Sequence, residues 1–284
     1  MGMYSFSYCS SLKSFVIPNS VVTLGKCSFY GCYNLLSIEI GNSVTSIGNS
    51  SFLYCSYLKE VTIGESVQTI ESYSFHGTSI VNLTIPNSVK VIENNAFSSC
   101  FSLKYLDLGN SLEEIGENAF YTCGVFELFI PNSVVTISRY AFQFSDLVKL
   151  TISGSVKTID SYAFFNCAFL EYVFYNGTTA PELGVGVFDG VHNLEIIVPD
   201  EFVGDHFGQY KIKRISDVNK KSNTTMIIVA VVCAVCGVAL IALVAFCVYL
   251  RRMKTKEGYS ALDSRLQSEV ENYEAMVNNY EQLK

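Results

Sequence analysis

Large apolar residues recur along most of this chain at an interval of 22 or 23 residues. One phenylalanine marks each interval: Phe6, Phe29, Phe52, Phe75, Phe97, Phe120, Phe142 and Phe164. A serine keeps the same phase, mostly within Asn-Ser-Val: Ser20, Ser43, Ser66, Ser88, Ser111, Ser133 and Ser155. Self-similarity at this period is typical of solenoids, in which each repeat buries its apolar face against its neighbours. We therefore predict a mainly β repeat solenoid.

The sequence of each repeat predicts a short strand, a turn and a following segment whose apolar side chains face the core. The unit that starts at Leu35 reads LLSIEIGNSVTSIGNSSFLYCSY. Its residues 38–40 alternate apolar and polar, as a half-buried strand does, and the glycine or proline that follows ends the strand. Val44, Ile47 and the phenylalanine five residues later are expected to fill the core. Burial of each ring contributes roughly 2–3 kcal/mol.

Written generally, the unit is L-x-x-[LIV]-x-[IL]-[PG]-[NES]-S-[VL]-x-x-I-x-x-x-x-F-x-x-C, which resembles the BspA-like leucine-rich repeat over residues 1–198. The resemblance implies an elongated, curved solenoid with a parallel sheet on one face. It also implies a surface protein, of the trichomonad-like protist type with a C-terminal transmembrane helix. Relatives of this kind are associated with adhesion to host cells or extracellular matrix.

The remaining segments differ in composition from the repeats. Residues 199–215 leave the repeat pattern, and we predict that they cap the C-terminal end of the solenoid. Residues 216–225 form a polar stalk. Residues 226–250 carry no charge and would reach about 37 Å as a helix, which is enough to span a bilayer. Residues 251–284 form a polar tail.

The charges beside the apolar segment predict its orientation. Arg251, Arg252, Lys254 and Lys256 follow it directly, which favours a cytoplasmic C-terminus and an extracellular repeat domain at the plasma membrane. No signal peptide pattern opens the chain. The start within a repeat indicates either a truncated N-terminus or export driven by the single span. Four sequons fit an extracellular domain: Asn49, Asn82, Asn176 and Asn223.

Charge and composition limit the classes of partner and of chemistry that the chain can support. Residues 1–198 carry 8 Lys and Arg against 16 Asp and Glu, with no basic stripe, so we exclude nucleic acid as a partner. The three histidines have no partners at metal or triad spacing, so we predict no enzyme activity, no metal and no cofactor. One cysteine recurs three residues after the repeat phenylalanine. Disulfides between coils are conceivable, but Thr78 and Ser145 occupy the same slot, which favours buried free thiols.

The outward positions of the predicted strands are the first candidates for binding. In the later repeats they carry aromatic and acidic side chains on a polar face: Tyr105, Asp107, Glu127, Phe129, Tyr172 and Phe174. Exposed Tyr and Phe are typical anchors of recognition surfaces. Neutral drift of surface positions is the alternative, because aromatic residues also suit strands.

The tail carries three copies of the pattern Tyr-x-x-Φ, in which Φ is a bulky apolar residue. The pairs are Tyr259 with Leu262, Tyr273 with Met276, and Tyr280 with Leu283. They resemble sorting signals that clathrin adaptors bind as an extended strand. The tail also fits a helix with a short apolar heptad seam, so both interpretations remain. The seam residues are Leu262, Leu266, Val270, Tyr273, Val277 and Tyr280.

These features predict a single-pass cell-surface protein that binds without catalysis. The expected partner is a host or microbial surface protein or a matrix component, and the expected role is adhesion. The alternatives are an endocytic or scavenging receptor that uses the tail tyrosines, and a surface coat or decoy protein without a dedicated ligand.

Overall fold

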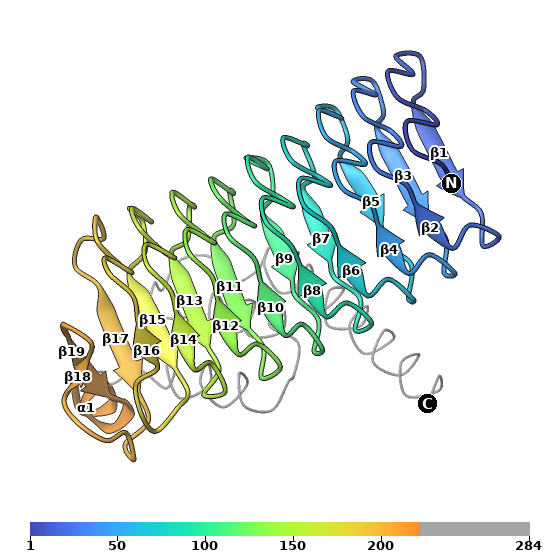
Figure 1. The fold of residues 1–284 in the computed structure, drawn as a ribbon. Helices are drawn as coiled ribbons and strands as arrows, with labels where there is room; N and C mark the ends of the chain where they lie inside the picture. The colour runs from blue at the N-terminus through green and yellow to red at the C-terminus, as the bar shows by residue number, and fades with distance from the viewer. Residues whose placement is uncertain (222–284) are drawn as a thin grey trace, which may run out of the picture. The chain divides into compact units, whose positions relative to one another are not determined.

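The computed structural model of the chain describes residues 1–221. Residues Met1–Lys220 form one compact unit. Its successive coils stack side by side along one axis, and each coil contributes one longer and one shorter strand (Figure 1). The predicted mainly β solenoid with repeats of 22 or 23 residues is therefore confirmed for this part of the chain.

The longer strands of the coils run parallel to one another. They are β1 (Ser14–Ile17), β3 (Ser37–Ile40), β5 (Glu60–Thr62), β7 (Asn82–Thr84), β9 (Tyr105–Asp107), β11 (Glu127–Ile130), β13 (Lys149–Ile152), β15 (Tyr172–Tyr175) and β17 (Glu195–Val198). They form three ladders, β1-β3-β5, β7-β9 and a larger one that starts at β11 and continues into the C-terminal segment. We call the outward side of these strands the strand face.

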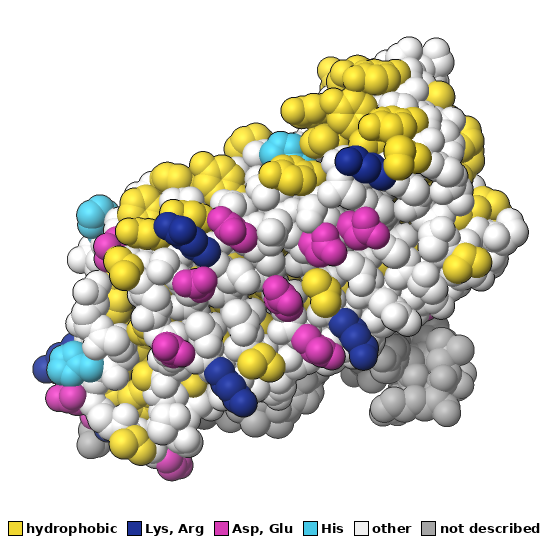
Figure 2. Space-filling model, in the orientation of Figure 1, with side chains coloured by type: hydrophobic (Ala, Val, Ile, Leu, Met, Phe, Trp, Pro, Cys, Tyr) yellow, Lys and Arg dark blue, Asp and Glu magenta, His cyan; other side chains and the backbone are white. Residues whose placement is uncertain are grey.

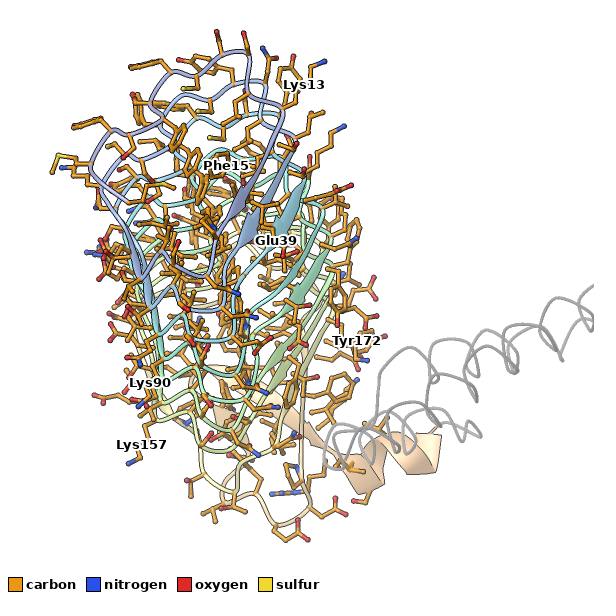
Figure 3. The ribbon with its side chains drawn as sticks, turned by 90° about the vertical axis from the view of Figure 1, so that its right-hand side faces the viewer. Lys13, Phe15, Glu39, Lys90, Lys157 and Tyr172 are labelled. Carbon is orange, nitrogen blue, oxygen red and sulfur yellow. The ribbon has the colours of Figure 1, made fainter. Side chains whose placement is uncertain are left out.

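The shorter strands form a continuous parallel sheet on the other side of the coils (Figure 3). They are β2 (Thr23–Leu24), β4 (Ser46–Ile47), β6 (Thr69–Ile70), β8 (Val91–Ile92), β10 (Glu114–Ile115), β12 (Thr136–Ile137), β14 (Thr158–Ile159) and β16 (Glu182–Leu183). Their second residue is a buried Ile or Leu in all but the last, where Leu183 is half-buried. Tyr172 lies on the side of the strand face in Figure 3, whereas Lys90 and Lys157 lie on the opposite side.

The core is a file of phenylalanine rings between these two layers. The repeat phenylalanines from Phe29 to Phe188 are buried, and Phe6 in the first coil is half-buried. Neighbouring rings lie parallel with centroids 4.9–5.5 Å apart. This spacing is close to the distance between neighbouring strands. One ring per coil therefore packs in register with the two sheets.

Two residues beside each repeat phenylalanine adopt left-handed backbone conformations, a feature that the apolar pattern did not predict. They lie two positions before and two positions after the ring. Around Phe142, for example, Tyr140 has φ 59° and Phe144 has φ 59°. The same geometry recurs with Gly31 and Gly77 at φ 68° and 70°. A bulky residue in this region costs about 1–3 kcal/mol, so packing of the coils must offset the strain.

From Phe29 to Phe164, the residue three positions after each repeat phenylalanine, most often cysteine, donates a hydrogen bond to a backbone carbonyl. The Cys123 thiol donates to the carbonyl of Phe97 in the preceding coil at 3.2 Å, and Cys167 donates to Phe142 at 3.2 Å. Ser145 donates in the same way to the carbonyl of Phe120 at 3.1 Å. This shared bond explains why Cys and Ser exchange in the slot. All seven cysteines of the described part are free thiols. Six of them occupy this slot, and of those six only Cys9 is half-buried instead of buried.

Residues 199–214 cover the last coil. β19 (Tyr210–Arg214) pairs parallel with β17, and β18 (His206–Phe207) folds back antiparallel onto β19. Phe207 packs against Tyr175 with ring centroids 5.1 Å apart. The Arg214 guanidinium donates to three carbonyls of the preceding loop, those of Asp200, Phe202 and Gly204. These contacts fix the segment on the end of the core.

The helix α1 (Ile215–Lys221) follows this segment and occupies part of the predicted stalk. Within residues 1–221 no helix is long and apolar enough to cross a membrane. The predicted span 226–250 and the tail 251–284 lie outside the described residues.

Candidate ligand-binding surface

The strand face is a set of aligned rows of outward side chains. One row joins the first residues of the strands, and its longest continuous part is Glu127↔Lys149↔Tyr172↔Glu195. The next outward row includes Phe129↔Thr151↔Phe174↔Ile197. Because each row has one residue per coil, neighbours lie about 5 Å apart. The face therefore presents a fixed array in which only the side chains change.

Four of the six predicted binding residues gather on the later coils. Glu127 forms an ion pair with Lys149 at 4.0 Å, and the Lys149 ammonium lies 5.6 Å from the centre of the Phe174 ring. Phe174 in turn lies 6.4 Å from the ring of Tyr172. Phe129 is half-buried in the neighbouring strand. This group combines an anion, a cation and three rings that are at least partly exposed.

Tyr105 and Asp107 lie on β9, the strand next to β11 in the stack of coils. Tyr105 is 50% exposed, and the Asp107 carboxylate accepts a hydrogen bond from the Gly109 amide at 3.0 Å. Burial, with a smaller contribution from Asp107, raises the pKa of the Tyr105 hydroxyl. Tyr105 and Tyr172 are three strands apart, or roughly 14 Å. The six predicted residues therefore lie on one face and spread over the strands from β9 to β15.

Two outward positions of the strands are buried, contrary to the simple alternation. Ile197 is 2% exposed and Thr151 is 8% exposed. Ile197 lies between Phe174 of β15 and Lys213 of β19, and Thr151 lies between Phe129 and Phe174. Large neighbours in adjacent strands cover both side chains. The exposed part of the face is therefore smaller than strand alternation predicts.

The sequons occupy different environments. Asn82 is exposed on β7, where it is aligned with Tyr105. Asn49 and Asn176 are half-buried, and the Asn49 amide oxygen accepts a hydrogen bond from Ser50 at 2.8 Å. Asn223 and the tail residues Tyr259, Leu262, Tyr273, Met276, Tyr280 and Leu283 lie outside the described residues.

Side chains suited to metal binding or catalysis are dispersed. Within residues 1–221 no three His, Cys, Asp or Glu side chains gather in a way that could hold a metal. His206 contacts Asp205 at 2.7 Å on the surface of the C-terminal segment. His76 has a buried ring nitrogen without a partner in the described part, and burial lowers its pKa. Among residues 1–221, no set of metal ligands surrounds either histidine.

Sequence reasoning missed the largest group of exposed rings, which lies on the loops that precede the longer strands. Figure 2 shows hydrophobic side chains along this edge, which is the upper edge in Figure 1. In the first three coils the edge carries five tyrosines that we call the tyrosine cluster: Tyr8, Tyr30, Tyr33, Tyr54 and Tyr57. The recurrent Phe-x-Tyr-Cys of the first and third repeats was the available signal.

These coils define a leucine-rich repeat protein, because each coil contributes one longer parallel strand and buries its apolar side only against its neighbours. Residues 1–104 and 90–203 match the family described as the BspA type leucine-rich repeat region, in 6 copies. The chain belongs to this family. No curated protein sequence matches it.

Several solved structures are similar to the chain. A leucine-rich repeat protein from Bacteroides ovatus is 23% identical with a TM-score of 0.57, over 76% of this chain and 64% of that one. The leucine-rich repeat protein of T. pallidum is 25% identical with a TM-score of 0.48, over 67% and 80%. A leucine rich cell surface protein from Faecalibacterium prausnitzii is 21% identical with a TM-score of 0.35, over 79% and 86%. The chain thus spans about two thirds of the Bacteroides protein, with which it shares the fold.

Proposed function

We propose that this chain is a single-pass protein of the plasma membrane whose repeat domain faces outward and binds a partner without catalysis. The partner is a surface protein or matrix component of a host or of another microbe, and the result is adhesion. The observation that carries this proposal is the strand face. The inward residues of each coil repeat and hold the strands in register, whereas the outward side chains differ from coil to coil. An extended, fixed face of this kind suits recognition of a large partner.

Charge and ring exposure indicate where contact would begin. Tyr105 and Tyr172 are 50% and 37% exposed on a face that also carries Asp107 and Glu127. Tyrosine buries a large area at low entropic cost and keeps a hydroxyl for hydrogen bonding. We therefore expect truncation of these two side chains to weaken binding of the partner more than truncation of any other residue on the face.

Adherence of cells that display the full chain tests the proposal. A Tyr105→Ala, Tyr172→Ala double variant should reduce adherence to epithelial cells or matrix several-fold. The control is Tyr73→Asn, which removes a ring that is 41% exposed on a turn after β6, at φ 59°, which asparagine tolerates. Adherence of the wild type no greater than that of cells without the protein would refute adhesion.

Location is tested separately, with intact cells treated with a protease. Digestion of the repeat domain, with the tail left intact, is the expected result. A repeat domain protected until the cells are lysed would place it inside and would refute the orientation on which adhesion depends.

The three Tyr-x-x-Φ motifs support a second role as an endocytic receptor that binds a clathrin adaptor through its tail. Replacing Tyr259, Tyr273 and Tyr280 with alanine should leave adherence unchanged and slow internalisation of surface-labelled protein. Replacing Ser260, Glu274 and Glu281, which lie between the motif positions, with alanine is the matched control. Unchanged uptake in the tyrosine variant would refute this role.

A further inference from the structure

The tyrosine cluster is an ordered array that is distinct from the strand face. Tyr8 and Tyr30 meet edge to face with centroids 5.2 Å apart, and Tyr30 meets Tyr54 in the same way at 5.7 Å. Tyr8 is 60% exposed, Tyr57 is 55% exposed and Tyr33 is 44% exposed. Rings from three successive coils thus hold one another in place while their outer surfaces face solvent.

Backbone geometry supports this array from beneath. Gly31 has φ 68°, and a Cβ atom added there would lie 2.8 Å from the Tyr8 ring. The Tyr8 ring therefore rests on the backbone of the second coil at a point where no side chain intervenes. A left-handed conformation at this position favours glycine, so the same residue satisfies the turn and seats the ring.

The charge of this edge differs from that of the rest of the repeats. No Asp or Glu occurs in its segments across the first six coils: 6–13, 29–36, 52–59, 75–81, 97–104 and 120–126. Two exposed lysines, Lys13 and Lys59, flank the cluster, and neither forms an ion pair within residues 1–221. Residues 1–198 as a whole carry twice as many acidic as basic side chains. The edge is therefore complementary to an anionic partner.

The spacing of rings and charges matches a linear polymer of sugars. Lys13 and Lys59 occupy the same position two coils apart, or roughly 10 Å at the strand spacing. Each coil advances by about the length of one sugar ring in an extended chain. An extended peptide repeats its side chains on one face about every 6.7 Å, which falls out of step with the coils. Because one coil matches one sugar in length, a lysine on every second coil can pair with a negative group on every second sugar.

We propose that the tyrosine cluster, with Lys13 and Lys59, binds an anionic polysaccharide that carries a negative group on every second sugar. The electron-rich faces of the tyrosine rings pack against the C–H faces of the sugars, and the two ammonium groups pair with the anions. This inference rests on the proposed outward orientation and names one ligand class for the binding role. It adds a contact on the loop edge to the strand face that is proposed for adhesion.

Titration of the full 284-residue chain in detergent with hyaluronan oligosaccharides tests the proposal, with dextran as the uncharged probe. The chain contains 18 Tyr and no Trp, so its fluorescence reports on tyrosine directly. A Tyr54→Ala, Tyr57→Ala variant should bind hyaluronan about tenfold more weakly. A Lys13→Gln, Lys59→Gln variant should lose a similar factor and much of the salt dependence. A Lys90→Gln, Lys157→Gln variant, at exposed positions on the side opposite the strand face, is the matched control and should stay within about twofold of the wild type.

Each other result overturns the proposal. Absence of saturable hyaluronan binding, equal binding to dextran, or an equal loss in the Lys90→Gln, Lys157→Gln control would each do so. If the tyrosine-cluster variant loses adherence to cells while the wild type ignores hyaluronan, the edge binds a protein instead. Adherence that persists in the cluster variant but fails in the strand-face variant refutes this inference and leaves the proposed adhesion intact.

Discussion

Replacing Ser74 with alanine should stabilise the solenoid. Ser74 precedes the repeat phenylalanine Phe75, is fully buried, and its hydroxyl has no hydrogen-bond partner within the described residues. The same position in four later coils is a fully buried alanine: Ala96, Ala119, Ala141 and Ala163. The fold therefore already accommodates alanine in this slot.

The magnitude follows from the cost of a buried hydroxyl. A polar group without a partner in the interior costs about 1–3 kcal/mol, and its removal leaves only a small space. We expect the free energy of unfolding of the Ser74→Ala variant to rise by about 1 kcal/mol. For a domain of this size that corresponds to a rise in Tm of about 2–4 °C.

Ser51 offers a matched control in the preceding coil. It is equally buried and also precedes a repeat phenylalanine, but its hydroxyl donates to the carbonyl of Gly48 at 2.5 Å. Ser51→Ala loses this bond and should lower the free energy of unfolding by about 1 kcal/mol. The Ser51 hydroxyl is hydrogen-bonded and the Ser74 hydroxyl is not, so the two substitutions should shift stability in opposite directions.

Urea unfolding followed by tyrosine fluorescence measures both shifts. The urea midpoint should change while the slope m stays constant, because neither variant alters the surface exposed on unfolding. If Ser74→Ala lowers the midpoint, or if both variants move it in the same direction by similar amounts, then the difference in hydrogen bonding does not control stability at this position.

Three further predictions concern the core and its titratable groups. Phe97→Ala, in the middle of the ring file, should cost about 3–5 kcal/mol, whereas Phe6→Ala at the half-buried end should cost clearly less in the same urea experiment. Burial raises the pKa of the Cys167 thiol to about 12, so peptide mapping after alkylation at pH 8 should find it unmodified while half-buried Cys9 reacts. Burial lowers the pKa of His76, so the unfolded state binds its proton more tightly. Stability should consequently fall as the pH drops through about 6.5, and His76→Gln should weaken that dependence. Equal costs for the two phenylalanines, early alkylation of Cys167, or an unchanged pH profile in His76→Gln would contradict the respective prediction.

The repeat phenylalanines show what could be predicted without coordinates. Their spacing fixed the period, and the period required each ring to lie over the next, because a coil has no other apolar surface to pack against. The inward position of Val44 and Ile47 followed from the same argument, and both are fully buried. The exchange of Cys with Thr78 and Ser145 likewise indicated free thiols, although not the carbonyl that the thiols contact.

The binding surface was harder to predict because exposure depends on neighbours in other coils. Strand alternation placed Ile197 outward, but the C-terminal segment pairs with its strand and buries it. Phe129 and Phe174 are half-buried for a related reason, since they flank Thr151 across the ladder. The tyrosines of the loop edge follow no period of two, so strand alternation gives no signal for them.

The sequence by itself determined the solenoid, its period and its file of buried rings, because a repeated apolar pattern has one way to bury itself. The tertiary structure decided which outward side chains meet. Tyr8 and Tyr54 belong to coils that are separated by a complete repeat, and they join one cluster only through Tyr30 in the coil between them. Contacts of this kind depend on side-chain directions across stacked coils, which a pattern along the chain does not contain.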